Sequence, residues 1–324
     1  MTTGSDVMIS AEGLTKAFGP ATGIFEVDLR VRRGSVTALL GPNGAGKTTT
    51  VRTLTTLLAP DAGVVRVGGF DIRREADEVR SIIGIAGQVA SVDEQLSGIE
   101  NLAMFGRLNR LSRRDARTRS LALLEQFGLA DAATRLVKSY SGGMRRKLDL
   151  AVSLVAAPAV LFLDEPTAGL DPVGRVALWD LIGGLVGGGS TVLLTTQYLE
   201  EADRFANDAV LLDKGRVVAT GSPQALKAGI GRAQLELVAA TPADLERLST
   251  ALEPFGASVR AGSRIVSVPI AGSGNEGLRE LAAVLCAVEG AGAGVEGYEL
   301  GQVSLEDAFV QLTSAGLQLT SARS

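Results

Sequence analysis

Three short apolar runs along the chain predict strands that are buried on both sides. Residues 35–40, 159–163 and 191–195 are almost continuously aliphatic, and each run has glycine or proline close to at least one end. After the first run, apolar side chains recur at helical spacing over residues 48–58. Continuous apolar strands that alternate with helices are typical of a mostly parallel sheet covered on both faces. The pattern therefore predicts an α/β core.

Residues 89–157 carry a wholly helical pattern. Two serines support it, because Ser97 stands three residues before Glu100 and Ser112 stands three residues before Asp115. A serine followed at that distance by an acidic residue is typical of a helix start. We expect a helical subdomain here, inserted into the α/β core.

The pattern changes after about residue 231, which predicts a first domain of residues 7–229 and a second of residues 231–316. The order of elements in the second domain resembles a split βαβ unit of the ferredoxin type, a small α+β fold. Its predicted elements are strand 234–238, helix 242–254, a hairpin of 258–260 and 264–269, helix 277–288, strand 295–300 and helix 305–312.

Composition narrows the class of protein. The chain has 324 residues, 46% of them hydrophobic, and a net charge of −4. An acidic chain lacks the positive field that holds a nucleic-acid backbone, so we expect no nucleic acid as partner. Asp149 and Pro158 break the longest apolar stretch, residues 148–163, which also falls short of the roughly 18 residues of a spanning helix. A single Cys286, and a start without a signal-peptide pattern, favour a cytoplasmic protein.

A glycine-containing loop follows the first predicted strand and opens the first helix. In such a loop backbone N–H groups surround a phosphate, the lysine reaches the β- and γ-phosphate oxygens, and the threonine hydroxyl binds Mg²⁺. The flanking strand and helix distinguish it from a chance match in a chain with 40 glycines. We expect the loop, with Thr49 behind it, to bind a nucleotide. The loop consists of Gly41, Pro42, Asn43, Gly44, Ala45, Gly46, Lys47 and Thr48.

Two carboxylates stand at the end of the second predicted strand. Asp164 emerges at the edge where open α/β sheets bind ligands, and we expect it to hold Mg²⁺ through water. Glu165 follows it and is suited to accept a proton from an attacking water. An Asp-Glu pair alone is a simple strand end about as often as it is a catalytic site. The phosphate-binding loop in the same chain is what favours the catalytic interpretation.

A second anion site precedes these carboxylates. Ser141, Gly142 and Gly143 open a predicted helix over residues 144–156, which combines a helix N-terminus with a hydroxyl donor. Most Ser-Gly-Gly triplets are turns. Its distance from the phosphate-binding loop and the Asp-Glu pair after it favour a phosphate site instead.

Together these motifs point to a family: residues 10–225 resemble the ATP-binding subunit of ABC transporters, with residues 140–144 at the signature position. The resemblance implies a P-loop NTPase core with a mostly parallel sheet and a helical signature subdomain, and ATP and Mg²⁺ as cofactors. It also implies a head-to-tail homodimer, in which each ATP lies between Lys47 of one copy and Ser141 of the other.

Three further positions take their roles from the resemblance. Gln88 matches the Q-loop glutamine, which senses Mg²⁺ and the catalytic water and faces the permease, and its alternative is an ordinary loop amide. Asp171 matches the D-loop aspartate, which crosses the dimer interface. Phe18 matches the aromatic that stacks on adenine, although a core phenylalanine is a competing interpretation.

One position departs from the family pattern. Gln197 follows the third predicted strand, where most ABC ATPases carry a switch histidine that touches the γ-phosphate, and this chain has no histidine. A glutamine amide still donates a hydrogen bond to phosphate but holds no positive charge. We favour a weaker phosphate sensor over slower or altered hydrolysis.

Several segments look like the daunorubicin-resistance type of drug-exporter ATPase. They are residues 87–94, 101–106, 140–149 and 195–199. Members of this type lack transmembrane helices and work with a separate transmembrane permease, which places them at the cytoplasmic face of the cell membrane. Their appended C-terminal domain is similar in size to the second domain predicted here.

Two features keep more than one interpretation. Residues 304–309 fall where that type has an acidic-apolar motif linked to coupling, and they equally suit the amphipathic start of a terminal helix. An arginine cluster in the helical subdomain is either a solvated face or a contact with anionic lipid beside the permease. The cluster consists of Arg107, Arg110, Arg113, Arg114, Arg117 and Arg119.

We therefore predict an ATP-hydrolysing subunit that dimerises around MgATP and powers a separate permease, exporting a drug or antibiotic. One alternative is an importer or lipid-exporter subunit whose C-terminal domain is regulatory. A second is a soluble ABC protein acting on ribosomes or DNA, although such chains usually carry two nucleotide cores, a long coiled coil or zinc cysteines. A third is a non-hydrolysing module, which Glu165 disfavours and Gln197 keeps open.

Overall fold

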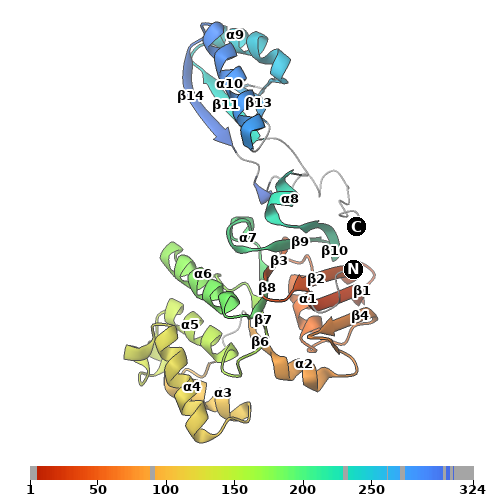
Figure 1. Ribbon diagram of the computed structural model, residues 1–324, viewed down its shortest axis with the longest axis vertical. Coiled ribbons are helices and arrows are strands. Elements are labelled where there is room, and N and C mark those ends of the chain that lie inside the picture. The colour runs from red at the N-terminus through yellow and green to blue at the C-terminus, as the bar shows by residue number, and fades with distance from the viewer. Residues whose placement is uncertain are drawn as a thin grey trace. The chain divides into compact units, whose positions relative to one another are not determined.

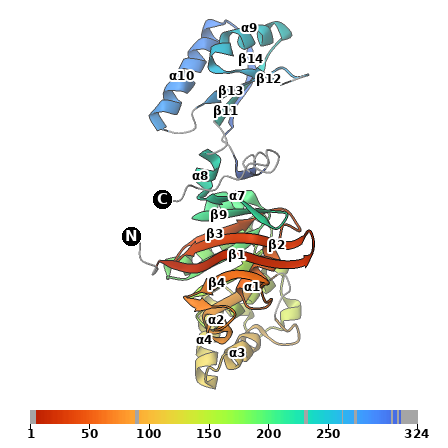
Figure 2. The same cartoon turned by 90° about the vertical axis from the view of Figure 1, so that its right-hand side faces the viewer.

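The computed structural model describes residues 6–87, 92–228, 233–260, 262–270, 274–301, 304–306 and 309. The chain forms two compact units, and the division between them falls at Pro223 and Gln224. The domain limits at 229 and 231 stay predictions. Figures 1 and 2 show the two units in perpendicular views.

The centre of the first unit is a six-stranded sheet in the order β10-β9-β3-β8-β7-β6. All neighbouring pairs are parallel except β9 and β10, which confirms the mostly parallel sheet. The register sets Leu40 opposite Thr196, and Asp164 opposite Thr195, so the ends of three strands meet at one edge. The strands are β3 (Val36–Leu40), β6 (Ile83–Ala86), β7 (Val160–Asp164), β8 (Thr191–Thr196), β9 (Asp208–Asp213) and β10 (Arg216–Gly221).

A second sheet, which the sequence pattern did not reveal, is antiparallel and has the order β2-β1-β4-β5. Its strands β2, β1 and β4 lie side by side in Figure 2. Ile9 and Val27 of this sheet belong to the same buried cluster as Phe162 and Leu193 of the parallel sheet, so one core supports both. The strands are β1 (Val7–Gly19), β2 (Thr22–Arg32), β4 (Ala62–Val67) and β5 (Phe70–Asp71).

Helices of the first unit fall into two groups. The second group, α3, α4 and α5, gathers away from β1 and β4 (Figure 1), and its helix α5 also packs against β6. The first group is α1 (Lys47–Leu54), α2 (Ala76–Ile82), α6 (Pro172–Gly187) and α7 (Leu199–Phe205), and α8 (Pro223–Ala228) follows at the division between the units. The second group is α3 (Gly98–Leu108), α4 (Arg113–Gln126) and α5 (Gly142–Ser153), with 3₁₀ turns at Ala130–Ala132 and Val137–Ser139.

The predicted helix starts of this subdomain are confirmed. Ser97 and Glu100 form a capping box at the start of α3, in which the Glu100 carboxylate accepts the Ser97 backbone N–H at 2.8 Å. The Ser112 hydroxyl accepts the Asp115 backbone N–H at 3.1 Å at the start of α4. Each cap satisfies backbone donors that the first turn of a helix leaves open.

The second unit has the predicted ferredoxin-like order. Its antiparallel sheet runs β12-β13-β11-β14, and α9 and α10 supply the apolar residues Leu248 and Val284 to its core. The elements are β11 (Ala233–Ala239), α9 (Pro242–Leu252), a 3₁₀ turn (Glu253–Phe255), β12 (Ser258–Val259), β13 (Ile265–Ile270), α10 (Gly274–Gly290) and β14 (Val295–Gly301). The predicted helix 305–312 lies mostly outside the described residues. Among the described helices, none combines the length and apolarity that a membrane span requires.

Candidate functional site

The phosphate-binding loop runs from the end of β3 to the start of α1, and two of its glycines are required by the backbone. Gly41 has φ 152° and Gly46 has φ 105°. A Cβ at Gly41 would lie 2.2 Å from the Leu212 carbonyl oxygen, and one at Gly46 would lie 2.5 Å from Ile24 Cγ2. Glycine suits both positions, because the backbone is left-handed there and a Cβ would collide with the Leu212 backbone at Gly41 and with the Ile24 side chain at Gly46.

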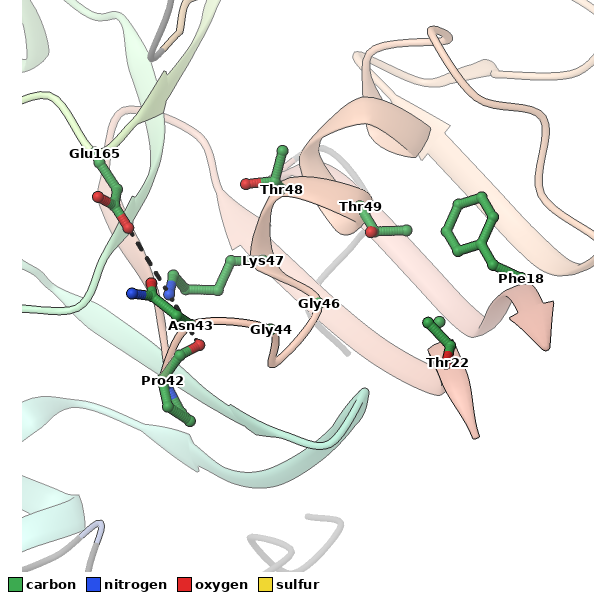
Figure 3. Close-up of a pocket in the computed structure, with 11 residues that line it drawn as sticks. Phe18, Thr22, Pro42, Asn43, Gly44, Gly46, Lys47, Thr48, Thr49 and Glu165 are labelled. Carbon is green, nitrogen blue, oxygen red and sulfur yellow. Dashed lines mark hydrogen bonds and ion pairs between the residues drawn. The ribbon is translucent and has the colours of Figure 1, made fainter. Parts of the chain in front are cut away.

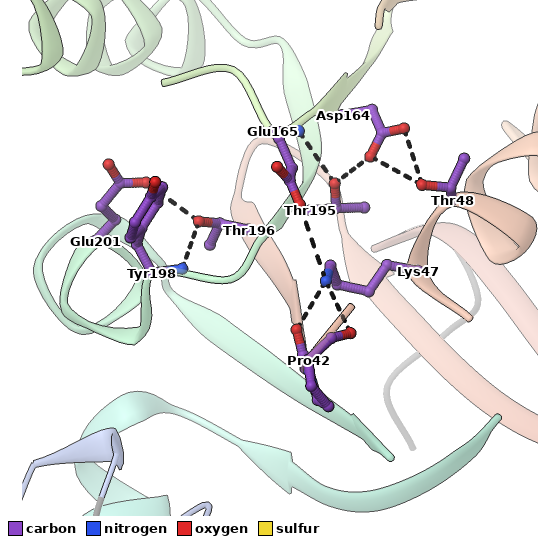
Figure 4. Close-up of polar contacts among 10 residues, drawn as sticks. Pro42, Lys47, Thr48, Asp164, Glu165, Thr195, Thr196, Tyr198 and Glu201 are labelled. Atoms are coloured by element: carbon purple, nitrogen blue, oxygen red, sulfur yellow. Dashed lines mark hydrogen bonds and ion pairs between the residues drawn. The ribbon is translucent and has the colours of Figure 1, made fainter. Parts of the chain in front are cut away.

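Lys47 lies at the centre of the site. Its ammonium donates hydrogen bonds to the carbonyl oxygens of Gly41 at 2.7 Å and Pro42 at 3.2 Å, and it lies 4.0 Å from Glu165 Oε1. Burial lowers the pKa of Lys47, while the charges of Glu165 and Asp164 oppose that shift. The loop therefore holds a buried cation whose counter-charges come from the end of β7 (Figure 4).

The end of β7 also joins the loop through hydroxyl groups. The Thr48 hydroxyl donates to Asp164 Oδ2 at 3.1 Å, and the Thr195 hydroxyl of β8 donates to Asp164 Oδ1. Thr195 was not predicted as a site residue, because in the sequence it is one more residue of a strand. The sheet register brings it to Asp164, and the two hydroxyls orient the carboxylate toward the loop (Figure 4).

Glu165 adopts an unusual backbone conformation. Its φ is 50°, in the left-handed region that non-glycine residues seldom occupy. Its backbone N–H donates to the Thr195 carbonyl oxygen at 3.1 Å. In this conformation the carboxylate faces Lys47 (Figure 4).

A cavity of about 270 Å³ adjoins the loop. Phe18 lies at one end of it with 58% of its surface exposed, and Glu165 lies at the other (Figure 3). Thr22, which follows the β1–β2 turn, also lines the cavity and was not anticipated. Gly41 and Ala45, which also belong to the loop, are buried and do not line the cavity. The other predicted lining residues are Pro42, Asn43, Gly44, Gly46, Lys47, Thr48 and Thr49.

Four residues predicted from the second anion site and the D-loop lie elsewhere. Ser141 and Gly142 are exposed at the start of α5, where the Ser141 hydroxyl accepts the Met144 backbone N–H at 3.2 Å. Gly143 is half-buried in the same turn. Asp171 is exposed and caps α6 through the Gly174 backbone N–H at 2.8 Å. None of the four lines the cavity of this chain.

Comparison with known proteins decides the family. The ABC transporter domain matches residues 24–168. The daunorubicin resistance ATP-binding protein DrrA3 of Streptomyces coeruleorubidus is 47% identical over 305 residues, which cover 94% of this chain and 95% of that protein. The chain belongs to the ATP-binding subunits of ABC transporters. It is therefore an ATP-hydrolysing enzyme.

Two further comparisons agree with this assignment. The daunorubicin/doxorubicin resistance ATP-binding protein DrrA of Streptomyces peucetius is 45% identical over 305 residues, covering 93% of this chain and 91% of that protein. A solved ATP-binding subunit of an ABC transporter is 26% identical, with a TM-score of 0.62 over 68% of this chain and 92% of that structure. The fold class predicted from the sequence is confirmed.

The residue predicted to contact the γ-phosphate from the end of β8 is polar and uncharged. Gln197 is exposed directly after β8 and does not line the cavity. Gln88, the predicted Q-loop residue, lies outside the described residues. The roles assigned to these two glutamines stay predictions.

A buried carboxylate four residues after Gln197 was not predicted from the sequence. One oxygen of Glu201, on α7, accepts hydrogen bonds from the hydroxyls of Thr167 at 2.8 Å and Thr196 at 3.2 Å (Figure 4 labels Thr196 and Glu201). Burial raises the pKa of Glu201, while these hydrogen bonds oppose the shift. The chain after Glu165 and the end of β8 are thereby joined through one side chain. From the sequence, Glu201 is one of two consecutive glutamates and carries no signal of burial.

Proposed function

We propose that the chain binds MgATP as a head-to-tail homodimer and powers a separate transmembrane permease that exports a drug or antibiotic. The observation that carries the proposal is the meeting of Lys47, Thr48, Asp164 and Glu165 at one edge of the sheet, beside a cavity that ends at Phe18. A phosphate chain suits the cationic end of this cavity, and a purine suits the aromatic end.

The residues present fit a magnesium ion. The Thr48 hydroxyl and the Asp164 carboxylate are hard oxygen donors that already lie 3.1 Å apart. They are the residues that would hold the ion, directly or through water. When bound, Mg²⁺ neutralises the charge that develops on the β- and γ-phosphate oxygens.

The protein's own groups then divide the work. Lys47 binds the β- and γ-phosphate oxygens in place of the Glu165 carboxylate, and the loop N–H groups surround the β-phosphate. Glu165, placed across the cavity, orients a water and accepts its proton as the water attacks the γ-phosphate. Gln197 donates a hydrogen bond to the γ-phosphate as a neutral sensor.

The exposed position of Ser141 supports a shared site. In one copy Ser141 and Asp171 cap helices and do not line the cavity next to Lys47, so they do not reach a nucleotide bound in that cavity. In a head-to-tail pair the Ser141 hydroxyl and the N-terminus of α5 would face the γ-phosphate held by Lys47 of the other copy. Each copy thus completes the site of its partner.

The transported compound and the permease are proposed from the relatives. Proteins that are 45–47% identical over almost the whole chain are named for resistance to daunorubicin and doxorubicin. We infer the same class of cargo, an amphipathic drug or antibiotic, and a permease that provides the contact with the membrane at its cytoplasmic face.

The shared site is tested by mixing two inactive variants. Ser141→Arg obstructs the partner's site, and Lys47→Ala removes the local phosphate contact. In a mixed dimer one site carries both changes and the other carries neither. Random mixing puts about half of the chains in mixed dimers, so about a quarter of all sites are intact. Phosphate release by the mixture is therefore expected to recover to about a quarter of the wild-type rate, if each site works independently.

The control is Ser139→Arg, at an exposed serine two residues earlier. This variant should hydrolyse ATP at the wild-type rate without being mixed with a second variant. Absence of recovery in the mixture, with both single variants folded and dimeric in ATP, would show that each copy works alone or that both sites are required together. Crosslinking between residues 44 and 142 of different copies separates these two outcomes.

A further inference from the structure

A single arginine on α5 reaches the backbone of residues 164–166 at the end of β7, here called the catalytic loop because it contains Glu165. The Arg146 guanidinium donates to the carbonyl oxygens of Pro166 at 2.8 Å, Glu165 at 2.8 Å and Asp164 at 3.2 Å. It also donates to the carbonyl oxygen of Gly87, after β6, at 2.5 Å. Four carbonyl groups from two segments of the core thus converge on one side chain of the helical subdomain.

The surroundings of Arg146 hold it in place. Its side chain is 15% exposed, and Asp149 Oδ2, one turn further along α5, lies 3.7 Å away with a side chain that is 2% exposed. A guanidinium offers five N–H donors in a rigid plane, and here most of them point at carbonyl oxygens. A lysine ammonium at the same place has three donors on one atom and would not span these carbonyls.

The contact at Glu165 matters because its backbone is strained. With φ at 50°, Glu165 keeps its conformation only while neighbouring groups hold it. Its N–H donates to the Thr195 carbonyl oxygen, and its carbonyl oxygen accepts hydrogen bonds from Arg146 at 2.8 Å and from the Ala168 backbone N–H at 3.2 Å. Besides the local turn to Ala168, one contact therefore comes from the sheet and one from α5, the helix that begins after Ser141.

We propose that Arg146 is a positioning residue for ATP hydrolysis, which makes the orientation of the Glu165 carboxylate depend on the position of α5. When Ser141 contacts the nucleotide bound by the other copy, α5 is held in position, and Arg146 on the same helix then fixes residues 164–166 of its own copy. The inference rests on the proposed role of Glu165.

The neighbouring arginine provides a matched control. Arg145 makes an ion pair with Glu94 at 2.9 Å and donates to the carbonyl oxygens of Tyr140 and Lys138, each at 3.3 Å. All three partners lie in the helical subdomain. Arg145→Met removes the same charge and the same number of donors from the same helix, without touching the catalytic loop.

The test compares the full-length Arg146→Met, Arg146→Lys and Arg145→Met proteins in phosphate release and in equilibrium binding of ATP. We expect Arg146→Met to lower kcat by about tenfold or more with ATP affinity within about twofold of wild type, the signature of an effect on the chemical step. Arg146→Lys should recover less than half of the lost rate, and Arg145→Met should keep the wild-type kcat. An equal loss in Arg145→Met, or a wild-type kcat in a folded Arg146→Met protein, would overturn the proposal.

Amide hydrogen exchange tests the contact between Arg146 and the catalytic loop independently of the rate of ATP hydrolysis. Arg146→Met should speed exchange in a peptide covering residues 164–168 by about fivefold or more and leave a peptide covering residues 41–50 unchanged. Arg146→Lys carries the same test if the methionine variant does not fold. Glu165→Gln, assayed in parallel, separates the two proposals. Full hydrolysis by Glu165→Gln refutes the role of Glu165, whereas unchanged exchange in both Arg146 variants refutes the link.

Discussion

Replacing Glu165 by glutamine should tighten ATP binding as well as stop hydrolysis. The Lys47 ammonium lies 4.0 Å from Glu165 Oε1, and the two side chains are 6% and 12% exposed. Glu165→Gln keeps the size of the side chain and removes the charge. Lys47 then has one fewer competitor for phosphate, and the γ-phosphate no longer meets the negative charge of Glu165.

The size of the effect follows from the distance. Two unit charges about 4 Å apart at an effective dielectric constant of about 20 interact by about 4 kcal/mol. Part of this is retained, because Asp164 stays close to Lys47 and the glutamine oxygen keeps a partial negative charge. A quarter to a half of it, about 1–2 kcal/mol, is released on binding, which corresponds to about 5–30-fold tighter binding of ATP.

The assay is equilibrium binding of a non-hydrolysable ATP analogue to the full chain, in Mg²⁺, at low salt and at physiological ionic strength. The gain should persist at the higher salt, since buried charges are screened weakly. Glu200→Gln, an exposed carboxylate on α7, is the control and should leave the affinity unchanged. If Glu165→Gln binds the analogue with wild-type or weaker affinity, the Lys47–Glu165 pair does not compete with phosphate and the reasoning fails.

The remaining predictions concern the switch region. Gln197→Ala should slow phosphate release severalfold, whereas Gln197→His should keep or raise the rate and add an inflection at about pH 6.5; unchanged rates and pH profiles in both variants would refute a phosphate contact by Gln197. Burial raises the pKa of Glu201 above its ordinary value of 4.5, so the folded state holds this proton more tightly than the unfolded state. The free energy of unfolding contributed by Glu201 is then largest below pH 4.5 and falls as the pH rises through the raised pKa. Thermal denaturation of wild type and Glu201→Gln from pH 4 to 7 should show this fall only in the wild type, and parallel curves would refute it.

Local patterns determined much of this protein. The parallel strands, the capped helices and the phosphate-binding loop are readable from sequence, because each depends on the spacing of neighbouring residues. The ferredoxin-like order of the second unit follows from alternation in the same way. The antiparallel sheet was not predicted, because β1 pairs with β2 and β4 through register shifts that break the period-two alternation of apolar and polar residues.

Only the tertiary structure decided how the chemical groups meet. Lys47 and Glu165, Asp164 and Thr195, and Arg146 and Pro166 are separated by between 20 and 118 positions, and no spacing rule connects such pairs. The register of β7 against β8, and the packing of α5 on the loop after β7, bring these groups together. The sequence by itself therefore determined which chemical groups the protein carries, whereas long-range packing decided which of them share a site, because side-chain contacts across a core depend on how whole elements pack.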